Sequence, residues 1–335
     1  MARTAVILFN LGGPDRPAAV EPFLFNLFND PAIIGAPAPI RWLLAKGLSR
    51  RRAPVARAIY DRIGGGSPLL AQTEAQAAAL TALLGPEHRV FVAMRYWHPF
   101  VAEAAEAAKD WGAERVVLLP LYPHFSTTTT GSSLTGWTAA VAKLGWRVPT
   151  SLVCCYPILS GLVEAMAALV AAGHAEAAAA GPPRVLFSAH GLPQRVVDRG
   201  DPYPLQVAQT AAAVAAATGI ADLDWVLCYQ SRVGPLAWIG PSIEDELARA
   251  GRDRVPVVVV PVAFVSEHSE TLVELDIEYR HRAEGLGIPA YVRVATVGCH
   301  PAFIAGLAAL ANDPGGERGR ACAAAGRDCA CGGVP

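Results

Sequence analysis

Short apolar runs bounded by glycine and proline alternate along this chain with longer alanine-rich stretches. Apolar runs of this length are typical of buried strands, and their alternation with helices is the pattern of βαβ units around parallel sheets. The candidate strands are residues 5–9, 89–93, 115–119, 150–155, 184–188, 224–228, 255–260 and 290–293. We therefore expect an α/β fold with two four-stranded parallel sheets, joined by a crossover near residues 146–150.

The length of 335 residues is sufficient for two such domains, each with its own core. We place the first domain at residues 1–149 and the second at 150–301. From Asn312 onward the composition changes to glycine, arginine and cysteine without periodicity. Residues 302–335 are therefore expected to form a C-terminal helix and an appended tail.

Charge and hydropathy exclude several classes of protein. The formal net charge of −1 argues against a chain that coats nucleic acid. The longest interval without Asp, Glu, Lys or Arg, residues 116–142, contains two prolines and a Ser/Thr/Gly run, so it is a poor membrane-spanning helix. The first apolar run is too short for a signal peptide and ends at Gly12. These features predict a cytoplasmic protein.

A basic and apolar segment stands out between residues 31 and 60. It contains no acid, but six arginines and lysines lie beside Ile33, Ile34, Trp42, Leu43 and Leu44. Such a segment suits a flap that contacts a lipid surface or an apolar ligand with carboxylate groups. An ordinary helix with its basic side in water is the alternative.

The candidate chemistry lies at the ends of two predicted strands. His190 follows the strand over 184–188, and in open α/β sheets ligands bind beyond the carboxyl ends of the strands. If the stretch after the uncharged run PVVVVPVAFV is helical, Glu270, Glu274 and Glu278 form one stripe. Partly buried, such a row should hold raised pKa values and serve as a path for protons or metal ions. A hydrogen-bonding structural histidine and a solvated helix face are the alternatives.

Eight motifs together resemble one family, the ferrochelatases, which insert ferrous iron into a porphyrin. They occur in family order and are NLGGP (10–14), YDRIGGGSPL (60–69), MRYWHP (94–99), YPHFSTTTTGSS (122–133), FSAHGLP (187–193), VDRGDPYP (197–204), YQSRVGPLAWIGP (229–241) and FVSEHSETLVELDIEY (264–279). The glycine-rich turns among them lack the spacings of phosphate-binding loops. A nucleotide-binding enzyme is therefore less well supported.

The resemblance implies two similar Rossmann-like domains with the active-site cleft between them. His190 and Glu270 would face each other across that cleft as the catalytic pair, with His190 as pyrrole proton acceptor or iron-delivering ligand and Glu270 as its acid/base counterpart. Both residues would also belong, with Glu274 and Glu278, to the path of Fe²⁺ or protons. The candidates for holding the porphyrin are Tyr60, Ser67, Arg95, Tyr96, Tyr122 and Trp238, for which ordinary core packing is the alternative. The expected reaction converts protoporphyrin IX and Fe²⁺ to protoheme. Coproporphyrin III as substrate, or a carrier without turnover, are the alternatives.

The tail cysteines Cys322, Cys329 and Cys331 supply three soft ligands. Some ferrochelatases carry a [2Fe-2S] cluster on three such cysteines and one from mid-chain. The animal-type fourth position is Thr127 here, so the resemblance to bacterial members makes Cys154 or Cys155 the candidate. Zinc and a tail without any ligand are the alternatives. Peripheral contact with the inner face of a membrane is a further hypothesis, and the oligomeric state, monomer or homodimer, is left open.

Overall fold

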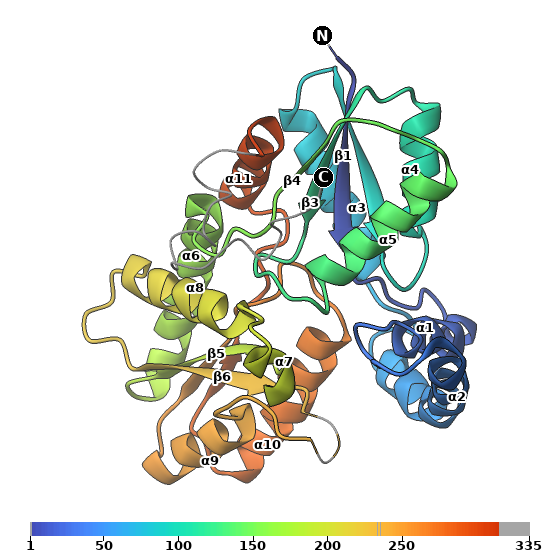
Figure 1. Cartoon of the computed structure of the whole chain (residues 1–335). Helices are drawn as coiled ribbons and strands as arrows, with labels where there is room; N and C mark the ends of the chain where they lie inside the picture. The colour runs from blue at the N-terminus through green and yellow to red at the C-terminus, as the bar shows by residue number, and fades with distance from the viewer. Residues whose placement is uncertain (1, 233, 235, 315–335) are drawn as a thin grey trace. The chain divides into compact units, whose positions relative to one another are not determined.

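Two four-stranded parallel sheets form the framework of the protein, as the sequence predicts (Figure 1). The structure is a computed structural model, and it describes residues 2–232, 234 and 236–314. Within them the chain divides into two compact units, one up to Cys155 together with the segment from Leu307, and the other Tyr156–Gly306. The tail cysteines Cys322, Cys329 and Cys331 lie outside the described residues.

The first sheet has the strand order β2-β1-β3-β4. Its strands are β1 (Thr4–Asn10), β2 (His88–Met94), β3 (Arg115–Pro120) and β4 (Thr150–Leu152). All three pairings are parallel, with Ile7 opposite Phe91 on one side and Leu118 on the other. Because β4 pairs with β3, the segment that the sequence analysis places at the start of the second domain belongs to the first unit.

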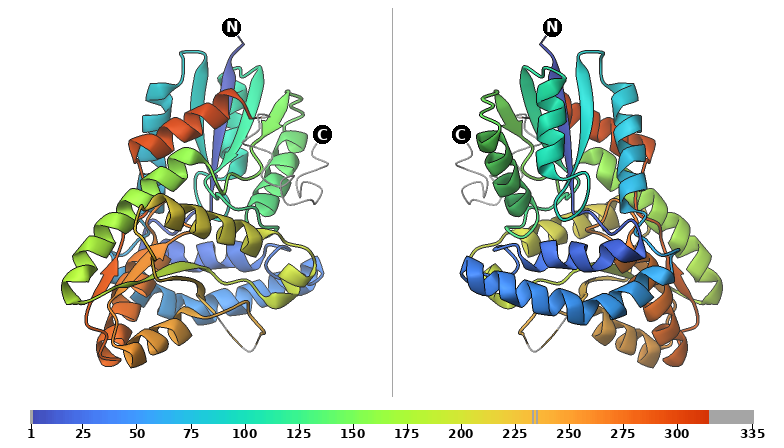
Figure 2. Two further views of the ribbon diagram at one scale, coloured as in Figure 1. Left: turned by 90° about the vertical axis from the view of Figure 1, so that its left-hand side faces the viewer. Right: turned by 90° about the vertical axis from the view of Figure 1, so that its right-hand side faces the viewer.

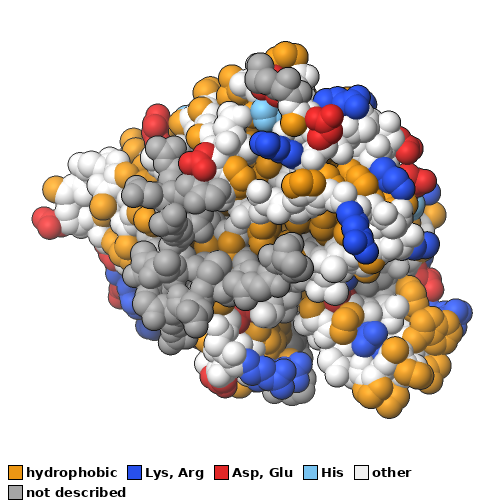
Figure 3. Space-filling model, turned by 45° about the horizontal axis from the view of Figure 1, so that its top comes forward, with side chains coloured by type: hydrophobic (Ala, Val, Ile, Leu, Met, Phe, Trp, Pro, Cys, Tyr) orange, Lys and Arg blue, Asp and Glu red, His pale blue; other side chains and the backbone are white. Residues whose placement is uncertain are grey.

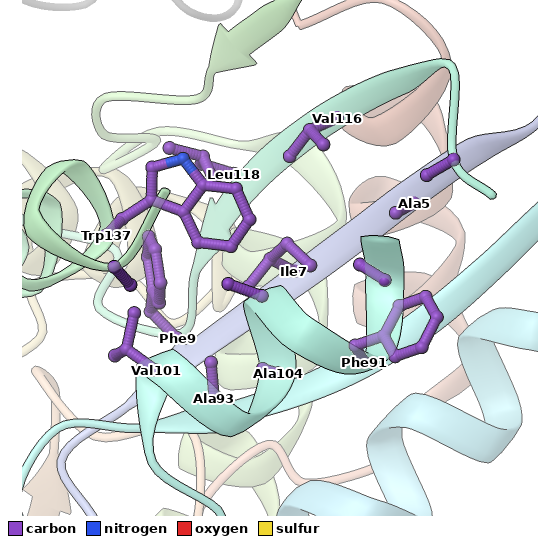
Figure 4. Close-up of a cluster of buried hydrophobic side chains, with 14 of the residues drawn as sticks. Ala5, Ile7, Phe9, Phe91, Ala93, Val101, Ala104, Val116, Leu118 and Trp137 are labelled. Carbon is purple, nitrogen blue, oxygen red and sulfur yellow. The ribbon is translucent and has the colours of Figure 1, made fainter. Parts of the chain in front are cut away.

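The helices α4 (Val101–Asp110) and α5 (Thr130–Lys143) cover one face of this sheet, and α3 (Leu69–Leu83) packs against β2 and β1 on the other. Figure 4 shows the core that α4 and α5 build, in which Ile7, Phe9 and Leu118 point toward Trp137 of α5. The apolar runs form buried strands. In β1, for example, every residue from Ala5 onward is buried.

A pair of helices extends from this unit. The helices α1 (Val20–Phe28) and α2 (Ala38–Asp61) lie side by side in both views of Figure 2. Their inner side packs with Tyr60, Tyr96 and Trp97. The outer side of α2 leaves large apolar side chains in solvent, which Figure 3 shows as hydrophobic surface at the lower right: Ile40, Trp42, Leu43, Leu44 and Val55.

The second sheet has the order β6-β5-β7-β8, and its pairings are also parallel. Its strands are β5 (Arg184–His190), β6 (Trp225–Gln230), β7 (Val257–Pro261) and β8 (Tyr291–Arg293). The helices of this unit are α6 (Ser160–Ala177), α7 (Gln194–Asp198), α8 (Tyr203–Ala217), α9 (Ile243–Asp253), the π-helix η3 (Glu270–Glu278) and α10 (Tyr279–Gly285), and α11 (Pro301–Asn312) follows β8.

One helical stretch of the second unit, Ser160–Ala180, is long and apolar enough to cross a membrane by length and composition. It contains α6, whose Gly173 packs directly on the sheet. A Cβ at this glycine would lie 2.5 Å from Val294 and 3.2 Å from Val258. This close approach is what an alanine- and glycine-rich helix on a buried sheet requires.

Candidate active site

His190 and Glu270 meet at the point where the second sheet reverses its strand order. His190 is the last residue of β5, and Glu270 is the first residue of η3, which follows β7. From the central strand β5 the chain continues to β6 on one side and later to β7 on the other. The carboxyl ends of two strands that flank such a switch point are the usual ligand site of an open parallel sheet.

The two side chains are in direct contact. The Nδ1 atom of His190 lies 2.8 Å from Oε2 of Glu270, and the side chains are 39% and 28% exposed. Both residues belong to the second unit. The resemblance implies instead that they face each other across a cleft between the two domains. Tyr203 supports the pair because its hydroxyl donates to the carbonyl oxygen of His190 at 3.1 Å.

The contact is an ion pair when His190 is protonated. Burial disfavours the imidazolium of His190, but the Glu270 carboxylate outweighs burial and raises the pKa of His190. Burial likewise disfavours the charged carboxylate of Glu270, but His190 and His268 outweigh it and lower the pKa of Glu270 to about 2. The raised pKa values expected along the acidic row are therefore wrong for Glu270, because a cation lies beside it. Burial lowers the pKa of His268, although the charges of Glu270 and Glu267 oppose this effect.

Glu274 is the next acid along η3, and it is held by neutral donors. The Ser231 N–H donates to Oε1 at 2.8 Å, and the Ser231 hydroxyl donates to Oε2 at 2.5 Å. Gln230 donates to Oε2 at 3.1 Å and is itself oriented by Ser188, whose hydroxyl donates to the Gln230 amide oxygen at 2.8 Å. Burial and the charge of Glu270 raise the pKa of Glu274, as the sequence predicts for this position.

The row ends at the surface. Glu278 is exposed, and with Glu274, Tyr279 and Glu244 it lines a surface hollow of about 740 Å³. The segment is a π-helix and not the α-helix that the periodicity suggests. Its i to i+5 hydrogen bonds widen the turn, yet residues four apart still lie near one another. The row Glu270, Glu274 and Glu278 therefore runs from His190 toward solvent.

The candidates for holding a porphyrin are distributed over both units. Trp238 lies beside the turn after His190, where its ring approaches Gly191 so closely that an added Cβ would lie 3.3 Å from it. Tyr60, Ser67, Arg95, Tyr96 and Tyr122 belong to the first unit. Of these, Ser67 contacts the glycine turn after β1, since its N–H donates to the carbonyl of Pro14 at 2.7 Å. The hydroxyl of Tyr122 is buried, and burial raises its pKa.

Arg95 and Tyr96 are engaged by an acid that the sequence analysis does not single out. Asp30 is buried, and its Oδ2 lies 2.8 Å from Nη2 of Arg95 and accepts from the Tyr96 hydroxyl at 2.8 Å. The Ser132 hydroxyl donates to the same oxygen, and it also accepts from Nε of Arg95 at 2.6 Å. Arg95 therefore has a fixed orientation, with about a quarter of its side chain exposed at 23%.

Ser231, Gln230 and Tyr203 are further residues of the site that the sequence analysis does not assign. Gln230 and Ser231 lie in the motif YQSRVGPLAWIGP, and Tyr203 lies in VDRGDPYP. These two motifs were the sequence signal that could have identified them as site residues. Ser231 has a φ of 61°, a left-handed conformation that costs free energy for a serine. In this conformation both its N–H and its hydroxyl reach Glu274. Such residues cluster at functional sites.

The mid-chain cysteines Cys154 and Cys155 follow β4 and are buried. Among residues 2–232, 234 and 236–314, no three His, Cys, Asp or Glu side chains are arranged to hold a metal ion. The described cysteines could therefore supply only part of a ligand set, and Cys154 is disulfide-bonded.

The fold defines the class as an α/β protein with two four-stranded parallel sheets, in which a histidine and a carboxylate meet at the second sheet. The sirohydrochlorin chelatase SirB from Bacillus subtilis has the same fold, with a TM-score of 0.54 at 12% identity, covering 92% of this chain and 94% of that chain. A second SirB structure, from Bacillus subtilis subspecies spizizenii, has a TM-score of 0.51 at 12% identity and covers 92% of each chain.

The sequence defines the family within this class. The family model for ferrochelatase matches residues 3–314. A ferrochelatase of Caulobacter vibrioides is 53% identical over 320 residues, 94% of this chain and 91% of the relative. One of Phenylobacterium zucineum is 50% identical over 340 residues and covers 98% of both chains. The chain belongs to the ferrochelatase family, so the resemblance drawn from the motifs is confirmed.

Proposed function

We propose that the protein inserts Fe²⁺ into protoporphyrin IX to give protoheme and two protons. Membership of the ferrochelatase family supports this reaction. The contact between His190 and Glu270 is the observation that supports assigning the reaction to these two side chains. The contact places an imidazole and a carboxylate at the ligand-binding edge of a sheet. These are the two groups that an exchange of protons for a metal ion needs.

The ion pair suggests how the exchange begins. While His190 is protonated, its imidazolium balances the carboxylate of Glu270, and His190 cannot accept a pyrrole proton. Fe²⁺ that reaches Glu270 as substrate neutralises the charge that raises the pKa of His190. His190 then releases its proton and becomes an acceptor. Glu274, whose pKa is raised, and the exposed Glu278 continue this path to the surface hollow.

The porphyrin would be held by Trp238 beside the turn after His190 and by the candidates of the first unit. We propose that it lies in the active-site cleft that the resemblance implies between the two domains. Arg95 suits a propionate because Asp30 and Ser132 fix its guanidinium while part of it stays exposed. Protoporphyrin IX and coproporphyrin III both carry propionates, so the arginine fits either substrate.

An insertion assay tests the function. Purified protein should consume the fluorescence of protoporphyrin IX on addition of Fe²⁺ or Zn²⁺, and His190→Ala should abolish the reaction while porphyrin binding persists. His281→Ala is the matched control, because this side chain is 90% exposed, and it should retain full activity. Retained insertion by His190→Ala would refute the role of the imidazole, whereas binding without insertion by the wild type would leave a carrier.

A parallel assay with coproporphyrin III decides the substrate. The protoheme assignment requires that kcat/KM be greater for protoporphyrin IX than for coproporphyrin III. The reverse order would make the protein a coproporphyrin ferrochelatase with the same catalytic pair.

We also propose that the tail holds a [2Fe-2S] cluster through Cys322, Cys329, Cys331 and either Cys154 or Cys155. The spacing of the tail cysteines and the two buried cysteines after β4 support this ligand set. The protein should then be brown, and Cys329→Ser should bleach it. Separate Cys154→Ser and Cys155→Ser variants identify the fourth ligand, with Cys299→Ser as the control at an exposed cysteine. A colourless protein that contains zinc would refute the cluster.

The outer side of α2 supports a peripheral contact with an anionic membrane surface, which would place the protein at the inner face of the membrane. Leu43 is 65% and Val55 62% exposed, and they share the helix with Lys46 and Arg50. The protein should co-sediment with anionic vesicles at low salt, and Leu43→Glu should weaken binding. Leu83→Glu, at an exposed leucine of α3, is the matched control. Failure of the wild type to bind would refute the contact.

A further inference from the structure

Arg293, the last residue of β8, forms ion pairs with two acids. One acid precedes the π-helix η3, and the other lies within it. Its Nη1 lies 2.7 Å from Oε1 of Glu267, three residues before the helix. Its Nη2 lies 3.2 Å from Oδ2 of Asp276, inside the helix. The side chains of Arg293 and Glu267 are 9% and 12% exposed, so this ion pair is largely removed from water.

Further bonds join the same strand to the same part of η3. Arg280 donates to Asp276 at 2.6 Å and to the carbonyl of Tyr291, in β8, at 2.8 Å. The Tyr291 hydroxyl donates to the carbonyl of Leu275. Arg293 therefore belongs to a group of hydrogen bonds and ion pairs. They connect β8 with Glu267 and with the part of the helix around Asp276.

A π-helix of nine residues needs such support. Its i to i+5 hydrogen bonds are rare in proteins, and π segments occur mostly as single turns within α-helices. Glu270 and Glu274 lie between the two positions that Arg293 holds. A change at either position would shift both carboxylates relative to His190, which is fixed at the end of β5.

We infer that Arg293 is a positioning residue for metal insertion, which sets the geometry of Glu270 and Glu274 by holding η3 through Glu267 and Asp276. The inference rests on the proposed function for its effect on turnover. Arg293 touches neither of the two carboxylates in these contacts, and it acts through the helix that carries them. A shift of about 1 Å in a catalytic group is enough to lower turnover on the order of 100-fold.

The main variant is the double substitution Arg293→Met with Glu267→Gln. Removing the arginine alone would take the compensating positive charge away from the largely buried Glu267 carboxylate, which is strongly destabilising. The glutamine keeps an acceptor for the N–H of Thr296, which donates to Glu267 at 2.9 Å. Arg293→Lys serves as the conservative variant, because its single ammonium keeps the charge but not the forked contact with two acids.

Arg184 offers a matched control in the same unit. It also joins two acids, Asp224 and Asp253, each at 2.8 Å, and its side chain is 11% exposed. It lies at the start of β5, at the end of the strand opposite His190. Arg184→Met therefore removes a comparable arginine bridge without touching η3.

The experiment measures zinc insertion at a temperature at which every variant is folded, together with hydrogen exchange of the amides in 270–278. The double variant should lose kcat by about 10- to 100-fold with little change in the KM for porphyrin, and its η3 amides should exchange faster. Arg293→Lys should recover part of kcat. Arg184→Met should keep kcat within about twofold and leave exchange in η3 unchanged.

Wild-type kcat and unchanged η3 exchange in the double variant would overturn the inference. Equal losses of kcat in the double variant and in Arg184→Met would also overturn it, because the effect would then be general destabilisation. If the wild type inserted no metal, the proposed function would fail instead, and the exchange measurement alone would decide whether Arg293 holds the helix.

Discussion

The carboxylate of Asp30 should be worth about 3 kcal/mol to the first unit, and the substitution Asp30→Asn tests this value. One oxygen, Oδ2, takes Arg95, the Tyr96 hydroxyl and the Ser132 hydroxyl, while Oδ1 accepts from the N–H of Ala32 at 2.8 Å. An asparagine can offer only one oxygen. Either orientation of its amide therefore turns an NH₂ group toward at least one donor.

The magnitude follows from the buried donors. A hydrogen bond to a charged group contributes about 1.5 to 3 kcal/mol, and a buried donor left without an acceptor costs about 1 to 3 kcal/mol. Tyr96 is 1% and Ser132 3% exposed, so neither hydroxyl can turn to water. Weakening these two bonds and the contact with Arg95 gives about 3 kcal/mol. For a unit of this size that lowers Tm by about 6 to 12 °C.

Urea unfolding followed by tryptophan fluorescence measures the free energy of unfolding. Asp15→Asn is the control, because Asp15 also accepts from a buried ring, Trp97 at 3.0 Å, but its own side chain is 43% exposed. It should cost less than about 1 kcal/mol. If Asp30→Asn lowers the free energy of unfolding by no more than the control does, this carboxylate does not stabilise the packing at the end of the α1–α2 pair, and the reasoning is refuted.

Three further predictions concern the second unit. Gly191→Ala should impair folding and insertion together, because its Cβ would lie 2.9 Å from the carbonyl oxygen of Gln230, and thermal melting beside the zinc assay would show it. Ser231→Ala should lower kcat, since Glu274 loses the hydroxyl donor, whereas an unchanged pH profile of kcat would contradict that role. Glu270 has a folded pKa lowered to about 2 from 4.5, so its stabilising contribution is complete above pH 4.5 and is lost as the pH falls through about 2. The difference in unfolding free energy between wild type and Glu270→Gln should therefore shrink over that interval, and a constant difference would count against the ion pair.

The sheets could be predicted from the sequence because each strand is a local apolar run. The predicted strand 5–9 is observed as Thr4–Asn10, and 184–188 as Arg184–His190. The largest error in a strand boundary concerns the predicted strand 150–155, because the observed strand ends at Leu152. Beyond that residue the run is still apolar, but the pairing with β3 ends at Leu118 and Leu152. Hydrophobicity therefore locates a buried strand better than it locates the strand's last hydrogen bond.

The site could be predicted only in part, for a different reason. His190 and the acidic row are marked locally, by a strand end and by a repeat of four residues. The π-helical winding is not marked, since a repeat of four fits both windings, and residues of β8 hold the wider one. Asp30 is missed because its partners Arg95 and Ser132 lie 65 and 102 positions along the chain, and only the fold brings them together.

The identical strand order of the two sheets makes β1 and β5 counterparts, and their last residues can be compared directly. In β1 that residue is Asn10, whose amide donates to Thr73 inside the unit. In β5 it is His190, whose imidazole meets a carboxylate. Two sheets with the same strand order therefore present different chemistry at one corresponding strand end, with an amide bonded inside its own unit in the first and an ionisable ring beside a carboxylate in the second.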